Sequence, residues 1–288
     1  LDDKLIRVII NKARKDPKRV VFAEADNPKI LKAAQIAQDE GYAEPILLGN
    51  IQKIEELLEE HQIELKDTRI IDPLKEEVKQ LEYGQVLYEK RQRKGVTLNE
   101  AIKQMRSRTY FGTMMVEMNE ADALISGLTR RYPDTIRPAL EIVGVEPEVN
   151  KVAGLYIMIT KQGPLFFADA TVNVNPSAYD MVDITELTYH TVKQFNIEPR
   201  IALLSYSNFG SAKGESPSKV RKALEMLKEK HPDWKIDGEL QANLALNDKI
   251  LQEFFPFSDL INGGANTLIF PDLSSGNISY KLLQELGA

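Results

Sequence analysis

Short apolar, β-branched runs alternate with helical periods along the whole chain. In the first half, the run "RVVFAEA" at 19–25 predicts a strand, and the spacing of small apolar residues predicts a helix at 28–40. The same alternation predicts strands at 44–49, 68–72 and 121–127, and helices at 51–60, 74–93 and 98–107. The strand at 121–127 is mostly apolar, which indicates burial on both faces of a sheet.

The pattern changes near residue 151, where two apolar runs lie next to each other. Segments 152–160 and 164–173 are joined by "KQG", which predicts a β-hairpin. Beyond it we predict strands at 200–207, 235–240 and 267–272, and helices at 176–195, 217–230, 241–254 and 277–286. Such alternation predicts two α/β domains, 1–147 and 148–288, each with a mainly parallel sheet flanked by helices.

Composition and charge narrow the classes of function. The 43 acidic and 37 basic residues give a net charge of −6, so no overall positive field exists to hold nucleic acid or an anionic membrane. There is no cysteine, which excludes disulfides and thiolate chemistry, and the 3 histidines lie far apart, so we expect no metal site. No apolar run reaches the roughly 20 residues of a membrane helix, and we expect a cytoplasmic protein.

The two ends of the chain add one expectation. The first ten residues lack the apolar region of a cleavable leader. The chain begins with Leu1 rather than methionine, so we expect it to be a piece of a longer protein.

Candidate chemistry lies in the turns that follow strands, because ligands of open α/β sheets bind at that edge. The first such turn, 127–140, holds three arginines, Arg130, Arg131 and Arg137. Pro138 predicts a helix that starts at the proline, which puts Arg137 at the positive end of the helix dipole. An anionic ligand would explain a guanidinium there, and so would an ion pair with Asp134.

Two further turns are rich in small polar residues. The turn 205–215 carries Ser207, Asn208, Ser211 and Lys213, and the turn 271–281 carries Ser275 and Asn277 before a helix whose amides could hold an anion. Neither turn matches a P-loop, and no G-x-G-x-x-G follows a strand, so nucleotide phosphates bound in those two ways are excluded. Helix capping would explain the serines equally well.

Two acidic residues near a predicted strand end leave a choice open. Asp237 and Glu239 could serve in acid–base chemistry, or could pair with Lys235 and Lys249 in surface ion pairs. The single tryptophan, Trp234, is interpreted as core or interface packing.

Five stretches, in order and spacing, resemble the phosphate acetyltransferase family. They are "FAEADNPKILKAAQIAQDEGYAEPILLGN", "DALISGLTRRYPDTIRPAL", "ALLSYSNFGSAKGE", "DGELQANLALN" and "NTLIFPDLSSGNISYKLLQELG". Within that family, "SGLTRRYPDTIRP" and "LSYSNFGS" are similar to the C-terminal domain of large bacterial NADP-dependent malic enzymes. The acetyltransferases themselves resemble a pattern with a histidine near Arg130 or Arg131.

The resemblance implies a fold and a set of ligand-binding residues. The fold is of the isocitrate/isopropylmalate-dehydrogenase kind, with an interdomain cleft that accepts acetyl-CoA. Arg91 and Arg137 match family arginines associated with coenzyme A or phosphate. The complete expected set for acetyl-CoA or phosphate is Arg91, Thr129, Arg130, Arg137, Ser207, Asn208, Ser211, Lys213, Ser275 and Asn277. The family's catalytic Ser-Arg pair and later Asp would lie beyond Ala288, so we expect no catalytic residue in this chain.

Three functions remain to be weighed. The first is an acetyl-CoA-binding regulatory and oligomerisation domain of a malic enzyme, at least a dimer, with NADP and a divalent metal bound only in an upstream catalytic region. The second is an active phosphate acetyltransferase, which would convert acetyl-CoA and phosphate to acetyl phosphate and CoA. The third is a scaffold whose cleft binds nothing, for which apolar segments such as 152–160 and 254–261 would suffice.

Overall fold

The chain forms two compact units in a computed structural model that describes residues 3–145, 151–161 and 163–287. Residues Ile9–Gly144 form one unit, here the N-terminal unit. Residues Leu1–Val8 and Val145–Ala288 form the other, here the C-terminal unit. The predicted boundary between 147 and 148 lies outside the described residues.

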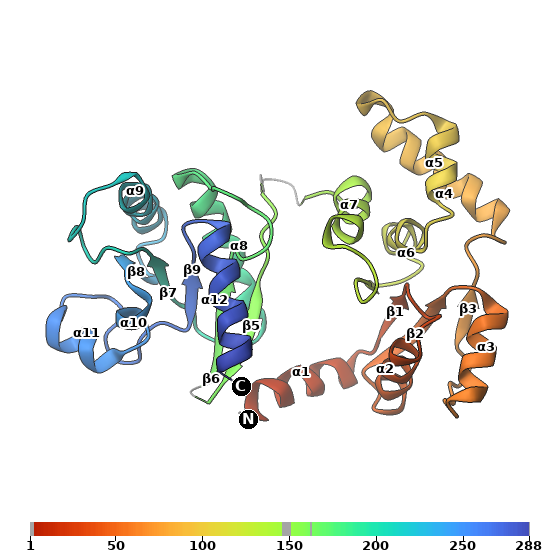
Figure 1. The fold of residues 1–288 in the computed structure, drawn as a ribbon, viewed down its shortest axis with the longest axis horizontal. Helices are drawn as coiled ribbons and strands as arrows, with labels where there is room; N and C mark the ends of the chain where they lie inside the picture. Colours follow the sequence, from red (N-terminus) through yellow and green to blue (C-terminus); the bar gives the residue numbers. More distant parts are fainter. Residues whose placement is uncertain (1–2, 146–150, 162, 288) are drawn as a thin grey trace. The chain divides into compact units, whose positions relative to one another are not determined.

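The N-terminal unit is built on a parallel sheet with strand order β3-β2-β1-β4 (Figure 1). Its strands are β1 (Lys18–Phe22), β2 (Ala43–Leu48), β3 (Arg69–Ile71) and β4 (Ala123–Ile125). Its helices are α2 (Pro28–Asp39), α3 (Ile51–Glu60), α4 (Glu77–Arg91), the 3₁₀ turn η1 (Gln92–Lys94), α5 (Leu98–Gln104), α6 (Arg108–Glu117) and α7 (Tyr132–Ile142). Helix α1 (Asp3–Lys15) contributes residues to both units.

Apolar residues pack on both faces of this sheet. On one face, Val20 and Leu47 pack against Leu31 of α2 and Ile54 of α3. On the other face, a second cluster joins the sheet to α4, α6 and α7. Alternate residues of β1 point to opposite faces, which is why both clusters draw on the same strand.

The C-terminal unit has a mixed sheet with strand order β5-β6-β9-β7-β8. Its strands are β5 (Tyr156–Thr160), β6 (Gly163–Ala168), β7 (Arg200–Leu204), β8 (Lys235–Leu240) and β9 (Thr267–Ile269). Its helices are α8 (Ala178–Gln194), α9 (Glu215–Lys230), α10 (Ala242–Ala245), α11 (Asp248–Phe254) and α12 (Leu273–Leu286). Only the β5–β6 pair is antiparallel among the described strands, which confirms the predicted hairpin.

Helices cover both faces of this second sheet as well (Figure 1). Helices α8 and α9 pack on one face through residues such as Met181 and Val220, and α10, α11 and α12 pack on the other through residues such as Leu251 and Tyr280. The predicted fold class, two α/β units with mainly parallel sheets flanked by helices, is therefore confirmed.

The structure differs from the sequence predictions at several elements. Strand β4 lies at a sheet edge, and Ile125 is 51% exposed, so this strand is not buried on both faces. The predicted helix 241–254 divides into α10 and α11, because the side chain of Asn247 accepts a hydrogen bond from the Ile250 amide and starts a new helix. Helices α1 and α6 were not predicted at all.

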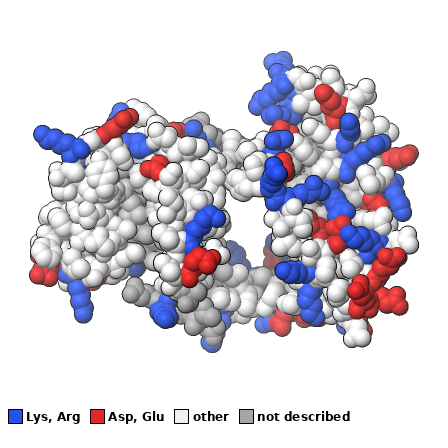
Figure 2. All heavy atoms as spheres, viewed as in Figure 1, with Lys and Arg blue, Asp and Glu red and all other residues white. Residues whose placement is uncertain are grey.

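Charge is distributed unevenly over the face drawn in Figure 2. There the N-terminal unit carries many charged side chains of both signs, whereas the C-terminal unit presents a largely uncharged surface. Within the described residues, no helix is long and apolar enough to cross a membrane.

Candidate functional site

Polar loops follow the carboxyl ends of parallel strands in both units. In the N-terminal unit, Glu24 follows β1 and the loop 126–131 follows β4. In the C-terminal unit, the loop 205–214 follows β7, and β9 leads into α12. The groups most suited to bind a ligand are therefore the side chains of these loops and of the helices beside them.

Arg91 and Tyr110 both contact the carboxylate of Glu141 in the N-terminal unit. Arg91 ends α4, and its Nη2 is 3.8 Å from Oε1 of Glu141 in α7. The hydroxyl of Tyr110, on α6, donates a hydrogen bond of 2.6 Å to Oε2 of Glu141. The charges of Arg137 and Arg91 both act on that hydroxyl, so both predicted arginines lie in the neighbourhood of Tyr110.

This cluster carries more positive than negative charge. Burial raises the pKa of Tyr110, the hydrogen bond to Glu141 raises it further, and the two arginines offset only part of the rise. Tyr110 therefore remains a hydrogen-bond donor at neutral pH. Nε of Arg91 is buried without a hydrogen-bond partner in the described part of the chain. Near Tyr110 there are thus two guanidinium groups and one carboxylate in contact with the cluster, which leaves donors and charge for an anion.

Arg137 lies inside α7, so the predicted helix start was wrong. Helix α7 begins at Tyr132 with a proline at its first turn, and Pro138 sits within it. The sequence offered two prolines, and the earlier one, Pro133, takes the position that suits proline best. The side chain of Arg137 is exposed, and no ion pair with Asp134 forms.

The loop before α7 is folded around a buried carboxylate. Glu24 is only 4% exposed and accepts hydrogen bonds from the amides of Gly127, Leu128 and Thr129 at 2.8, 2.9 and 2.9 Å. The Thr129 hydroxyl also donates to it. Burial raises the pKa of Glu24, but these hydrogen bonds outweigh burial and hold the pKa below its usual value.

The two residues that follow this loop, Arg130 and Arg131, are exposed. Neither forms an ion pair in the part of the chain that the structure describes. Because amide groups rather than cations satisfy Glu24, the arginines beside it keep their charge available to solvent or a ligand.

In the C-terminal unit, the polar residues after β7 bind mainly one another. Oγ of buried Ser207 accepts a hydrogen bond from the Ala212 amide, and Oγ of Ser211 accepts one from the Asn208 amide, each at 2.9 Å. Oδ1 of Asn208 accepts the Gln241 amide at 2.7 Å and joins this loop to the end of β8. The side chain of Lys213 is exposed.

The residues after β9 form the start of α12. Asp272 caps the helix, since its Oδ1 accepts a hydrogen bond of 2.8 Å from the Ser275 amide. The Ser275 hydroxyl donates to the Asp272 carbonyl, and Nδ2 of Asn277 donates to the Ala170 carbonyl at 3.3 Å. Both predicted side chains therefore bond to backbone carbonyls of the same unit, Ser275 within the helix cap and Asn277 to the segment after β6.

A groove of about 860 Å³ opens at this edge of the C-terminal unit. Lys219 of α9 lines this groove. Its Nζ donates hydrogen bonds to Oδ1 of Asn175 at 2.9 Å and to the Pro271 carbonyl at 2.8 Å. Burial lowers the pKa of Lys219, and the charges of Asp272 and Glu215 partly offset the shift.

The two acidic residues of β8 are buried and paired, but with partners other than those predicted. Glu239 forms an ion pair of 2.8 Å with Arg221, and Asp237 lies 3.5 Å from Nζ of Lys228. Asp237 also accepts a hydrogen bond of 2.7 Å from the Ser258 hydroxyl. The lysines proposed from the sequence were wrong, because the cations that pair with these carboxylates lie on α9, which packs beside β8.

Trp234 packs between two rings, as interpreted from the sequence. Its ring stacks on Tyr189 at a centroid distance of 3.7 Å and on His231 at 3.8 Å.

Sequence reasoning missed Glu24, Tyr110 and Lys219. Glu24 lies inside the predicted strand 19–25, flanked by alanines, and its position two residues after the end of β1 was the one signal that could have identified it. Tyr110 belongs to the unpredicted helix α6. Lys219 looks like one of several solvated lysines in α9, and no sequence signal marks it.

Comparisons with known proteins agree on one family. The family model described as "Phosphate acetyl/butaryl transferase" matches residues 4–288. The chain is 41% identical over 289 residues to a phosphate acetyltransferase of Thermoanaerobacterium thermosaccharolyticum, covering 98% of this chain and 87% of that protein. It is 38% identical over 287 residues to a phosphate acetyltransferase of Clostridium acetobutylicum, covering 97% and 86%.

A solved structure agrees with the sequence relatives. The phosphotransacetylase from Streptococcus pyogenes matches with a TM-score of 0.89 and 35% identity, covering 100% of this chain and 87% of that one. The family resemblance of the sequence motifs is thereby confirmed over the described fold. The chain belongs to the phosphate acetyl/butaryl transferase family.

Proposed function

We propose that this chain binds acetyl-CoA and phosphate and acts in acetyl transfer between them, as a phosphate acetyltransferase. The observation that carries the proposal is the cluster around Tyr110: Arg91 lies 3.8 Å from Glu141, Tyr110 donates a hydrogen bond to the same carboxylate, and the charge of Arg137 also acts on Tyr110. Two guanidinium groups with spare donors suit a doubly charged phosphate group. Family membership supplies the substrate class.

The reaction has a simple balance. A phosphate oxygen attacks the thioester carbonyl carbon, a C–O bond forms, the C–S bond breaks, and the sulfur leaves with the proton that phosphate gives up. Arginines near the reacting phosphate would lower the cost of bringing one anion to another and stabilise the negative charge that develops. We infer that Arg91 and Arg137 bind the phosphate group of a substrate, and that Arg130 adds to the local positive charge.

A regulatory acetyl-CoA-binding domain of a malic enzyme is the second candidate. It rests on the motif "SGLTRRYPDTIRP", in which Arg130 and Arg131 stand near the position of a histidine in the acetyltransferase pattern. The relatives described above are phosphate acetyltransferases, so they favour the enzyme over this candidate. NADP, a divalent metal and an upstream malic enzyme region belong to this second candidate alone.

Self-association remains a proposal for either function. Ile278, Leu282 and Leu286 of α12 are 58%, 55% and 82% exposed, and they recur every fourth residue along one side of the helix. A stripe of exposed apolar side chains is typical of a surface that another protein covers.

The test is an assay of acetyl-CoA formation from acetyl phosphate and CoA with the full-length protein. We expect turnover, and we expect Arg91→Gln and Arg137→Gln each to raise KM for acetyl phosphate about tenfold or more, since a charge-assisted contact contributes about 1.5–3 kcal/mol. Arg106→Gln, at an exposed arginine elsewhere in the N-terminal unit, is the control and should leave KM unchanged.

Calorimetry with acetyl-CoA separates the alternatives. Binding of acetyl-CoA without turnover, together with malate-dependent reduction of NADP, would contradict the enzyme and support the regulatory domain. Neither turnover nor binding would contradict both and leave the scaffold.

A further inference from the structure

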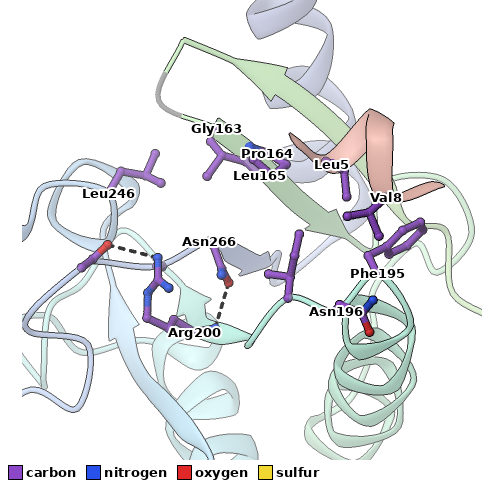
Figure 3. Close-up of a pocket in the computed structure, with 13 residues that line it drawn as sticks. Leu5, Val8, Gly163, Pro164, Leu165, Phe195, Asn196, Arg200, Leu246 and Asn266 are labelled. Carbon is purple, nitrogen blue, oxygen red and sulfur yellow. Dashed lines mark hydrogen bonds between the residues drawn. The ribbon is translucent and has the colours of Figure 1, made fainter. Parts of the chain in front are cut away.

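A second cavity lies in the C-terminal unit at the amino ends of the parallel strands, opposite the groove near Lys219. It has a volume of about 360 Å³ and is bordered by the first residues of β6 and β7, by the residues before β9 and by α1 (Figure 3). The groove near Lys219 borders the other edge, where the parallel strands end. A ligand in this cavity would therefore occupy a place separate from the candidate site of the same unit.

Arg200 supplies a cation to this cavity. Its Nε donates to the Gly264 carbonyl at 2.6 Å and its Nη2 to the Gly263 carbonyl at 3.3 Å. Its amide donates to Oδ1 of Asn266 at 2.8 Å. These contacts fix the side chain but do not neutralise it, and no carboxylate pairs with Arg200 within residues 3–145, 151–161 and 163–287.

A partly buried guanidinium without a counter-ion is unusual in a folded protein. Its desolvation is compensated best by an anion, to which the planar group can donate two hydrogen bonds at once. Nη1 of Arg200 makes no hydrogen bond to the described residues and remains available for such a partner.

The rest of the cavity wall is mainly apolar. Figure 3 shows Leu5, Val8 and Phe195 on the side away from Arg200, with Leu165 between them and Leu246. Leu5 is only 6% exposed, so the first turns of α1 are packed onto this unit. The cavity is thus amphipathic, with a positive group at one side and aliphatic and aromatic side chains at the other.

We propose that this cavity binds a small monocarboxylate with a short aliphatic body. The carboxylate would accept hydrogen bonds from Arg200, and the aliphatic body would lie against Val8 and Phe195. Inorganic phosphate would leave the apolar wall in contact with water, and a neutral apolar molecule would leave the guanidinium without a counter-ion. The volume falls within the range of about 300–1,000 Å³ that is typical of small-molecule sites.

The test is calorimetric titration of the full-length protein with hexanoate at neutral pH, with 1-hexanol and inorganic phosphate as comparison probes. We expect saturable binding of hexanoate, at least tenfold tighter than either comparison probe. Arg200→Gln should weaken hexanoate binding about tenfold or more, and a factor of ten equals about 1.4 kcal/mol. Arg106→Gln should leave it unchanged.

A second variant is needed because Arg200→Gln would also remove the hydrogen bonds of Arg200 to the turn at 263–264. Val8→Phe fills part of the cavity, lies on a half-exposed position of α1 and keeps every contact of Arg200, and it should abolish hexanoate binding. Saturation with acetyl-CoA should leave hexanoate affinity the same. Absence of hexanoate binding, equal binding of 1-hexanol, undiminished binding to Val8→Phe, or competition by acetyl-CoA would each overturn the proposal.

Discussion

Replacing Glu24 with glutamine removes the charge around which the loop 127–129 is folded. The carboxylate accepts hydrogen bonds from three backbone amides and one hydroxyl. Glutamine offers one acceptor oxygen and one donor group at the same place. In its better orientation the amide oxygen still faces Gly127 and Leu128, and the new NH₂ group faces the Thr129 amide, which loses its acceptor.

The cost follows from these contacts. One buried amide without an acceptor costs about 1–3 kcal/mol, and two charge-assisted hydrogen bonds become neutral ones of about half the strength. We therefore expect Glu24→Gln to destabilise the loop by about 3 kcal/mol relative to wild type. Amide hydrogen exchange at residues 127–129 should accelerate roughly a hundredfold, since each 1.4 kcal/mol is about a factor of ten.

The effect also has a defined pH dependence. The folded pKa of Glu24 lies below its unfolded value, so ionised Glu24 contributes stability at neutral pH, and that contribution is lost as pH falls through the folded pKa. The difference in exchange rates between wild type and Glu24→Gln should therefore shrink in acid. Glu55→Gln, at an exposed position of α3, is the control and should match wild type at every pH. Unchanged protection of residues 127–129 in Glu24→Gln would refute the reasoning.

Three further substitutions test other parts of the structure. Tyr110→Phe frees Glu141 to neutralise Arg91 more fully, so KM for acetyl phosphate should rise a few-fold in the steady-state assay, while an unchanged KM would contradict a role for this cluster in phosphate binding. Gly84→Ala would place a Cβ 2.7 Å from the Ile102 backbone, and overpacking of this kind costs about 1–3 kcal/mol, which urea unfolding should detect. Asp272→Ala removes the N-cap of α12 and should cost about 1 kcal/mol in the same measurement, whereas Asp272→Asn should restore most of it.

Local sequence patterns were sufficient to predict most of the strands and helices. The helix at 51–60 and the strand at 235–240 have the predicted bounds, because amphipathic periodicity and flanking turn residues are encoded within the segment itself. Helix α6 escaped prediction because it is buried around most of its circumference, with Phe111 through Met115 all enclosed, so its sequence has no polar face and no helical period.

The site was less predictable because its geometry depends on residues far apart in sequence. Arg91 and Arg137 were identified by resemblance, but their common neighbour Tyr110 could not be, since three separate helices bring these groups together. The same limitation applies to Lys219, whose environment is set by Asn175 and a carbonyl of the loop after β9. The sequence shows which polar residue stands at a position, but the burial of that residue and its hydrogen-bond partners depend on the whole fold.

Each unit buries a carboxylate where its parallel strands end, and backbone amides satisfy that carboxylate in both units. Glu24 after β1 and Asp169 after β6 are buried carboxylates at the carboxyl edge of a sheet, and both are satisfied mainly by backbone amides. Amide donors satisfy a buried carboxylate without using a cationic side chain. Arginines at the same edge, such as Arg130 and Arg137, therefore need not be spent on structural ion pairs, and a chain of net charge −6 can still present a local site for an anion.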